Sequence, residues 1–304
     1  MERVRLRNGL LMPAIGLGPM VMNYGKVRVG GNPSKWNLPC RAWRKAKRCL
    51  DYAQFVKAIS SGIQLGFRLV DYATAYGNLW AIGDAIRDSC VDRKDLVLTA
   101  RISNRAQFGG RDAIMRELDI ILDAYQTNYL DLLMFHFPVT DCYINTWNVL
   151  LELYGKGVCR SIGVANCHEH HLSTLESSGF APMYNQIEVH PLFTNLPLLD
   201  FCAERGIIVE SYTPLARMDD RLFRLPRLQA IACQHNKTAA QIVLRWHVQM
   251  GLVPCVRALG KKHQQEALDI FDFLLSKEEM AIISGFNINS RLRFDPDNCD
   301  FTIL

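Results

Sequence analysis

The chain has 304 residues, of which 49% are hydrophobic and 21% are charged. This composition supports a sizeable core and excludes bulk disorder. The apolar stretches fall well short of the roughly 20 residues of a membrane helix, and the N-terminus lacks the features of a signal peptide. We therefore expect a cytoplasmic, enzyme-like protein that does not associate with membranes.

Charge is distributed unevenly along the chain. Residues 1–50 hold eleven Lys/Arg and one acidic residue, whereas the other 254 residues hold 24 basic and 29 acidic ones. The densest basic cluster, CRAWRKAKR (Cys40–Arg48), is either a solvated face or a clamp for an anionic partner. A nucleic-acid partner is disfavoured, because the basic residues lie in one segment and no recognition motif accompanies them.

The ten cysteines are scattered singly along the chain, without a CxxC pair. Several of them lie inside apolar runs. This pattern favours free thiols over disulfides or zinc ligands, and we expect no metal site.

The chain opens with a hairpin that turns at Asn8-Gly9, and strand-like apolar runs then alternate with helix-period segments. The expected strands are 14–18, 67–71, 95–101, 129–135, 160–165, 183–188, 206–212 and 252–256. The expected helices are 53–63, 79–89, 111–125, 143–155, 169–177, 195–204, 227–249 and 263–273. Near-continuous apolar strands are typical of parallel sheets covered on both faces. The count predicts a single (β/α)8 TIM barrel domain over residues 1–304, with the hairpin capping its floor.

Residues 20–50 form a basic loop insertion after the first strand, in a position where barrel loops usually have about 2–6 residues. Loops of this kind border the active site of a barrel. Between Gly25 and Leu50 there are eight bases and no acid, together with Trp36 and Trp43. We predict a lid that favours an anionic or phosphorylated substrate. The alternative is a solvated loop that packs its tryptophans on the rim.

The carboxyl ends of barrel strands carry the active site. Here they bear Asp71, Arg101, His136, Asn166, Gln186 and Tyr212, and Tyr76 joins them from the loop after Asp71. A phenol beside a cation and an imidazole is suited to proton transfer, because positive charge lowers the pKa of tyrosine. Taken singly, each residue has a structural alternative, such as a helix cap for Asp71 or a core histidine for His136.

Six segments, in this order, resemble the aldo-keto reductase family over nearly the whole chain. They are GFRLVDYATAYGN (66–78), YLDLLMFHFP (129–138), RSIGVANC (160–167), YNQIEVHP (184–191), SYTPLA (211–216) and SRLRFDPDNCDF (290–301). YNQIEVHP is the most specific, and the last segment is similar to the short tails of bacterial-type members. Any one segment alone would be weak evidence.

The resemblance implies a monomeric oxidoreductase that reduces an aldehyde or ketone to an alcohol without a metal. Tyr76 would be the general acid, His136 would orient the carbonyl, and Asp71 would pair with the cation. The implied cofactor is NADPH in preference to NADH. Its implied binding residues are Asn166 and Gln186 at the carboxamide, Tyr212 at the nicotinamide ring, and Thr213, Leu215, Arg257, His263 and Glu266.

The sequence departs from the family pattern at several of these positions. The family's tetrad lysine is Arg101, which is larger, planar and a fork donor. Arg101 could lower the pKa of Tyr76 or press on the phenol and misplace it. The serine that helps to hold the carboxamide is Ala165, and Pro19-Met20 replaces a tryptophan.

The adenine-end motif is also changed. Ile-Pro-Lys-Ser becomes CVRA (Cys255–Ala258), and the arginine that follows aligns with His263. A 2′-phosphate could still bind Arg257, Lys261 or Lys262.

Two further function classes stay open beside reduction. One is an epimerase or isomerase that works by transient redox chemistry or another proton transfer, and the other is a cofactor-binding protein with little turnover. Consumption of NADPH with a panel of aldehydes separates a reductase from both.

Overall fold

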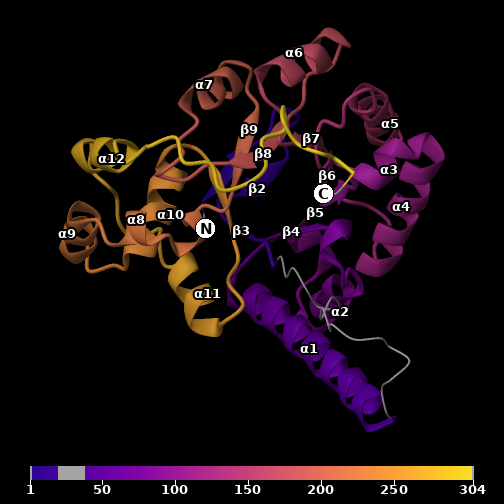
Figure 1. The fold of residues 1–304 in the computed structure, drawn as a ribbon, viewed down its shortest axis with the longest axis horizontal. Helices are drawn as coiled ribbons and strands as arrows, with labels where there is room; N and C mark the ends of the chain where they lie inside the picture. Colours follow the sequence, from indigo (N-terminus) through magenta and orange to yellow (C-terminus); the bar gives the residue numbers. More distant parts are fainter. Residues whose placement is uncertain (1, 20–37, 303–304) are drawn as a thin grey trace.

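The computed structural model describes residues 2–19 and 38–302. Eight parallel strands close into a barrel in the order β10-β3-β4-β5-β6-β7-β8-β9 (Figure 1). They are β3 (Gly16–Leu17), β4 (Leu69–Ala73), β5 (Val97–Ile102), β6 (Leu132–Phe135), β7 (Ile162–Ala165), β8 (Tyr184–Glu188), β9 (Ile208–Tyr212) and β10 (Val253–Val256). The predicted (β/α)8 barrel is confirmed, and closure leaves these eight strands without a free edge.

The N-terminal hairpin is also confirmed. Strand β1 (Arg3–Arg5) pairs antiparallel with β2 (Leu11–Pro13), and Gly9 between them has φ +88°, which suits glycine. Leu6 and Met12 are buried in one cluster with the residues that begin several barrel strands, among them Leu69, Val97 and Val253. The hairpin therefore closes the amino end of the barrel, opposite the ends that carry the site.

Helices surround the strands in Figure 1. They are α1 (Leu38–Leu65), α2 (Trp80–Ser89), α3 (Asn104–Phe108), α4 (Gly110–Tyr125), α5 (Tyr143–Gly155), α6 (Glu169–Ser177), α7 (Leu196–Glu204), α8 (Asp220–Phe223), α9 (Pro226–Gln234), α10 (Ala239–Gln249), α11 (Lys261–Leu268) and α12 (Lys277–Ser284). Helix α2 shows why these segments are helical: Ala81, Ile82, Ala85 and Ile86 recur at helical spacing and are all buried.

Several predicted boundaries were wrong, three of them in helices. The segment 227–249 forms two helices, because Asn236 adopts φ 52° and the Thr238 hydroxyl caps α10 by accepting a hydrogen bond from the Gln241 amide at 3.3 Å. Helix α11 ends at Leu268 instead of continuing to residue 273. Helix α1 begins at Leu38, so residues 38–50 are helical instead of belonging to a loop.

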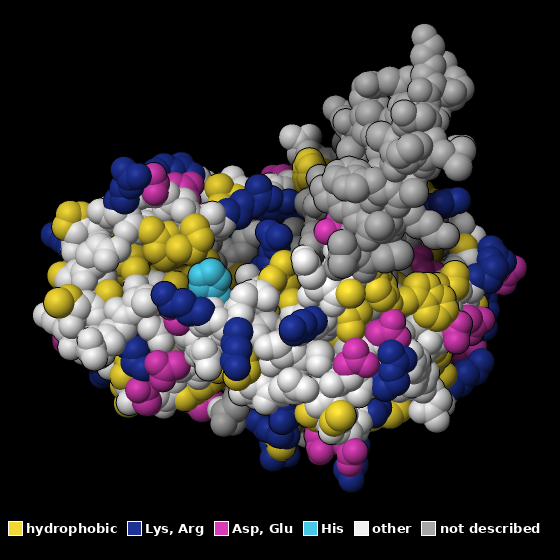
Figure 2. Space-filling model, turned by 90° about the horizontal axis from the view of Figure 1, so that it is seen from below, with side chains coloured by type: hydrophobic (Ala, Val, Ile, Leu, Met, Phe, Trp, Pro, Cys, Tyr) yellow, Lys and Arg dark blue, Asp and Glu magenta, His cyan; other side chains and the backbone are white. Residues whose placement is uncertain are grey.

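Residues 20–37 lie outside the described residues, and so do the side chains of 38–50. The predicted lid, with Trp36 and Trp43, therefore stays a prediction. On the face shown in Figure 2, Lys and Arg side chains are interspersed with Asp and Glu.

Eight cysteines lie among the described side chains, and all eight are free. Within residues 2–19 and 38–302, no helix is long and apolar enough to cross a membrane.

Most barrel side chains are apolar, but a polar layer lies inside the barrel near its carboxyl end. It includes Asp71, Thr99, Arg101, Gln186 and Glu210, all of them buried. The Cys255 thiol on β10 approaches Asp71 on β4, although β3 separates these two strands. Contact across an intervening strand requires both side chains to point into the barrel.

Candidate active site

A buried ion pair occupies the interior of the barrel. Arg101 Nη2 donates to Asp71 Oδ2 at 2.8 Å, and the Thr99 hydroxyl donates to the other oxygen of Asp71. We expected the strand to end at Asp71. Strand β4 instead continues to Ala73, so Asp71 lies inside it. Burial works to lower the pKa of Arg101, but Asp71, with smaller contributions from Tyr76, Glu210 and Cys255, acts in the opposite direction, and together these groups raise the pKa. Arg101 therefore stays charged.

Tyr76 lies directly above this pair, in a single 3-10 turn (Thr74–Tyr76) that follows β4. The Arg101 guanidinium carbon is 5.3 Å from the centre of the Tyr76 ring. The ring packs edge-on against Tyr72 at 5.4 Å. Burial raises the pKa of Tyr76, and the charge and hydrogen bond of Arg101 are the main influences in the opposite direction.

His136 follows β6, and its ring centre lies 6.0 Å from that of Tyr76. Burial, assisted by the charge of Arg101, lowers the pKa of His136 to about 3. The imidazole is therefore neutral at physiological pH and offers one N–H donor beside the phenol. The structure thus brings together all four predicted catalytic residues.

Asn166 connects three strand ends beside this group. Its Nδ2 donates to the carbonyl oxygen of His136 at 2.8 Å, and its Oδ1 accepts from the Tyr212 hydroxyl at 2.7 Å. Its backbone N–H donates to the Gln186 carbonyl oxygen at 2.8 Å. Asn166 has φ 60°, a left-handed conformation that asparagine tolerates better than most residues. Asn166, Gln186 and Tyr212 therefore meet as predicted, next to His136.

Glu210 is an ionisable member of the site that was not predicted from the sequence. It is fully buried on β9, and its Oε1 accepts from Gln186 Nε2 at 2.6 Å. One carboxylate oxygen of Asp71, one of Glu210 and the Cys255 sulfur lie within 4.8 Å of one another. Burial, followed by the charge of Asp71, raises the pKa of Glu210 to about 8. The sequence did contain a signal for this residue: Glu210 is a carboxylate inside an apolar strand, two residues before Tyr212.

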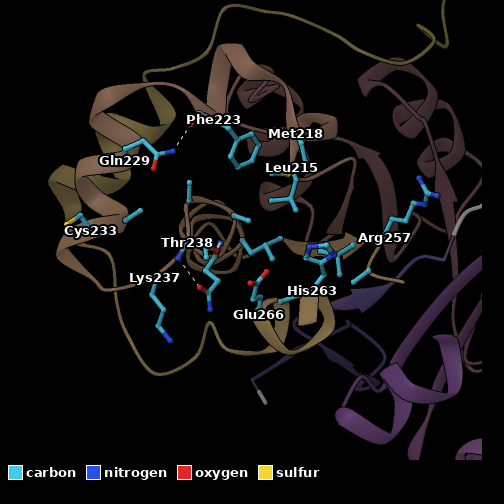
Figure 3. Close-up of a pocket in the computed structure, with 18 residues that line it drawn as sticks. Leu215, Met218, Phe223, Gln229, Cys233, Lys237, Thr238, Arg257, His263 and Glu266 are labelled. Carbon is cyan, nitrogen blue, oxygen red and sulfur yellow. Dashed lines mark hydrogen bonds between the residues drawn. The ribbon is translucent and has the colours of Figure 1, made fainter. Parts of the chain in front are cut away.

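Four of the predicted cofactor residues line a separate cavity of about 720 Å³ between α9, α10, α11 and the loop after β9. They are Leu215, Arg257, His263 and Glu266. Figure 3 shows His263 and Glu266 on one side of the cavity and Leu215, Met218 and Phe223 on the other. The cavity is therefore apolar on one side and carries ionisable groups on the other.

Thr213 does not line the cavity but lies one residue after β9, with φ 49°. Its hydroxyl is buried and has no hydrogen-bond partner in the part of the chain that the structure describes. A buried polar group without a partner is costly, so this hydroxyl is suited to an external ligand.

The sequence profile of the Aldo/keto reductase family matches residues 42–288. The chain belongs to this family. It is therefore an oxidoreductase, and carbonyl reduction is the activity that its relatives support.

Two curated relatives match over almost their whole length. Glyoxal reductase from Bacillus subtilis is 33% identical over 99% of this chain and 98% of its own. Methylglyoxal reductase DkgA from Escherichia coli is 31% identical over 97% of this chain and 96% of its own.

Solved structures also match this chain over almost its whole length. A crystal structure of a Gox0644 mutant in complex with NADPH has a TM-score of 0.83 and 29% identity, and it covers 98% of both chains. A crystal structure of MGS-M4, an aldo-keto reductase enzyme from a deep-sea metagenome library, has a TM-score of 0.84 and 28% identity, covering 98% of this chain and 99% of that one.

The raised pKa of Glu210 predicts a pH-dependent stability. The native state keeps a proton on Glu210 up to about pH 8, whereas the unfolded chain releases it near the ordinary value of 4.5. Stability should therefore fall as pH rises through this window, by at most about 1.4 kcal/mol for each pH unit. Glu210→Gln should flatten this dependence, as measured by urea unfolding at pH 6.0 and 7.5.

Glu204→Gln is the matched control, because Glu204 is exposed. It should keep the wild-type dependence. Equal slopes for wild type and Glu210→Gln would contradict the assignment.

Proposed function

We propose that this aldo/keto reductase reduces an aldehyde or ketone to an alcohol with NADPH, using Tyr76 as the general acid. The observation that carries the proposal is the convergence of Tyr76, Arg101 and His136 at the carboxyl end of the barrel. The bound cofactor supplies a hydride to the carbonyl carbon. The protein must then supply a proton to the carbonyl oxygen and hold the substrate in place.

Tyr76 is suited to donate that proton. Burial raises its pKa, so the hydroxyl is protonated at neutral pH. As the proton leaves, the phenolate that forms is stabilised by the Arg101 guanidinium, which lies 5.3 Å from the ring centre. Asp71 holds Arg101 in place through the 2.8 Å hydrogen bond. Arginine here supplies the positive charge that the family's lysine would supply.

His136 is suited to orient the substrate. Because burial lowers its pKa to about 3, it is a neutral donor and places no second positive charge against Arg101. Its N–H and the Tyr76 hydroxyl would bind the same carbonyl oxygen. These two contacts would fix which face of the carbonyl carbon is turned toward the hydride donor.

Features of the described residues fit a nicotinamide dinucleotide. Asn166, Gln186 and Tyr212 form one hydrogen-bonded edge next to His136, where the nicotinamide carboxamide and ring would bind. The Thr213 hydroxyl is buried without a partner. The 720 Å³ cavity is apolar on one side, as an adenine requires.

The cationic groups at the cavity favour NADPH over NADH. Arg257, Lys261, Lys262 and His263 are exposed on or near its rim. Glu266 is the acid in the lining, and it lies 3.8 Å from Lys262. Arg257 forms no ion pair with any described residue, so its fork is available for a 2′-phosphate.

The names of the relatives suggest the first substrates to test. Those relatives are called glyoxal and methylglyoxal reductases, so small dicarbonyl compounds are our proposed substrates. A monomeric state is likewise a proposal.

Tyr76→Phe should lower kcat for methylglyoxal by a factor of about 10² to 10⁴, because only the proton donor is lost. The NADPH dissociation constant, measured by fluorescence, should change by less than about twofold. The control is Tyr125→Phe, which removes a buried hydroxyl that donates to the Thr99 carbonyl oxygen. Activity within a few-fold of wild type in Tyr76→Phe would exclude Tyr76 as the acid.

Arg101→Lys should keep turnover within about tenfold of wild type, since it retains the charge beside Tyr76. Arg101→Met should lower turnover and move the basic limb of the pH–rate profile upward, because the main influence that lowers the pKa of Tyr76 is gone. It should also lower stability by roughly 3–5 kcal/mol, because Asp71 is left buried without its partner. An inactive but folded lysine variant would show that Arg101 has a fork-specific role.

Arg257→Gln should raise the KM for NADPH by at least about tenfold and leave the KM for NADH nearly unchanged. Lys237→Gln is the control. Lys237 also belongs to the cavity lining, but its ammonium points away from the cavity (Figure 3) and pairs with Asp269 and Asp272, both at 2.8 Å. Equal effects of Arg257→Gln on the two cofactors would contradict a 2′-phosphate contact.

A further inference from the structure

The C-terminal tail (residues 287–302) begins beside β8. The backbone N–H groups of Ile288 and Ser290 donate to the Leu192 carbonyl oxygen at 3.3 and 3.0 Å. Glu188, the last residue of β8, is buried, and its carboxylate accepts from the N–H groups of Leu292 at 2.6 Å and Arg293 at 3.0 Å. The middle of the tail is therefore fixed to the carboxyl end of a barrel strand.

The tail continues to the opposite side of the barrel. Asp297 lies 2.6 Å from Nδ1 of His168, the residue that precedes α6. The Phe301 carbonyl oxygen accepts from Asn104 at the start of α3, and the Phe301 ring packs against Phe137 at 6.1 Å. The tail thus crosses the carboxyl end of the barrel from β8 to the loops after β5 and β6 (Figure 1).

Arg293 lies within this crossing. Its backbone is held by Glu188, which pairs in register with Tyr212 on β9. Burial raises the pKa of Tyr76 and Tyr212 and lowers the pKa of His136, and the Arg293 charge acts on all three groups. Its guanidinium is therefore within electrostatic range of the proton donor, the orienting imidazole and the nicotinamide edge.

The Arg293 charge has no acidic partner among the ion pairs of residues 2–19 and 38–302. The neighbouring carboxylates have other partners. Glu188 accepts from two backbone N–H groups and lies 3.1 Å from His190. Asp297 contacts His168 and His170. By contrast, Arg291 donates to His168 at 3.3 Å and stacks on Phe193. The Arg293 guanidinium carbon lies 5.9 Å from the centre of the Phe294 ring, so the two arginines of this tail segment have different partners.

We propose that Arg293 binds a carboxylate of the substrate, so that the enzyme prefers oxo acids and semialdehydes whose carboxylate lies a few bonds from the reacting carbonyl. This inference rests on the proposed function. A guanidinium binds a carboxylate through two parallel hydrogen bonds, which fixes both distance and orientation. With the carbonyl oxygen at Tyr76 and His136, the second anchor would align the substrate along the crossing tail.

The test compares succinic semialdehyde with its uncharged methyl ester, each with NADPH. Wild type should prefer the semialdehyde, and its KM for the semialdehyde should rise with ionic strength while that for the ester stays constant. Arg293→Gln should lower the semialdehyde-to-ester ratio of kcat/KM by roughly 10- to 100-fold, mainly through KM. Arg293→Lys should retain part of the preference.

Arg291→Gln is the matched control, because it removes the same charge from the same tail and should leave the ratio unchanged. An unchanged ratio in Arg293→Gln, with turnover of the ester retained, would overturn the proposal. So would a salt-independent KM for the semialdehyde in wild type, a measurement that needs no variant. If wild type reduces neither compound nor methylglyoxal, the proposed function itself fails and this inference fails with it.

Discussion

The site depends on one buried ion pair, Asp71 with Arg101, inside a closed barrel. Removing two charges from water is costly, and the pair is stabilised by the attraction between the two charges and by the Thr99 hydroxyl, which donates to the second oxygen of Asp71. The pair fixes a guanidinium below Tyr76, where it opposes the effect of burial on the pKa of the phenol. The same charge also acts on His136. Burial and the Arg101 charge together lower the pKa of its imidazole, which is therefore neutral.

Glu210 shows how the barrel accommodates a second acid in this space. Two ionised carboxylates beside one guanidinium would leave an excess negative charge in the buried interior of the barrel. A proton on Glu210 removes that excess, while its Oε1 still accepts from Gln186 at 2.6 Å. Glu210 thereby holds the Gln186 side chain in a fixed orientation. The polar layer thus extends from the charged pair to Gln186, which is next to Asn166.

The tail and the cavity between α9, α10 and α11 lie outside this network and differ in character. The cavity is built from short helices and the loop after β9, with its cationic groups at the rim. The tail is fixed by backbone hydrogen bonds to a buried carboxylate and by a hydrogen bond between Asp297 and His168. The regular barrel therefore carries Tyr76, Arg101 and His136, and under the proposed function the irregular segments around it would determine which cofactor and substrate bind.

The sequence by itself determined the barrel, because eight apolar strand runs alternate with helical periods. It also determined which strands contribute Asp71, Arg101, His136 and Asn166 to the site, because parallel strands place their carboxyl ends at one mouth. Local pattern could not reveal the break between α9 and α10, which depends on one left-handed Asn236. It could not reveal the role of Glu210 or Arg293, because their significance lies in contacts with residues distant in sequence. Only barrel closure brings the side chains of Glu210 on β9 and Cys255 on β10 close to Asp71 on β4, and only the path of the tail brings Arg293 to the carboxyl end of β8.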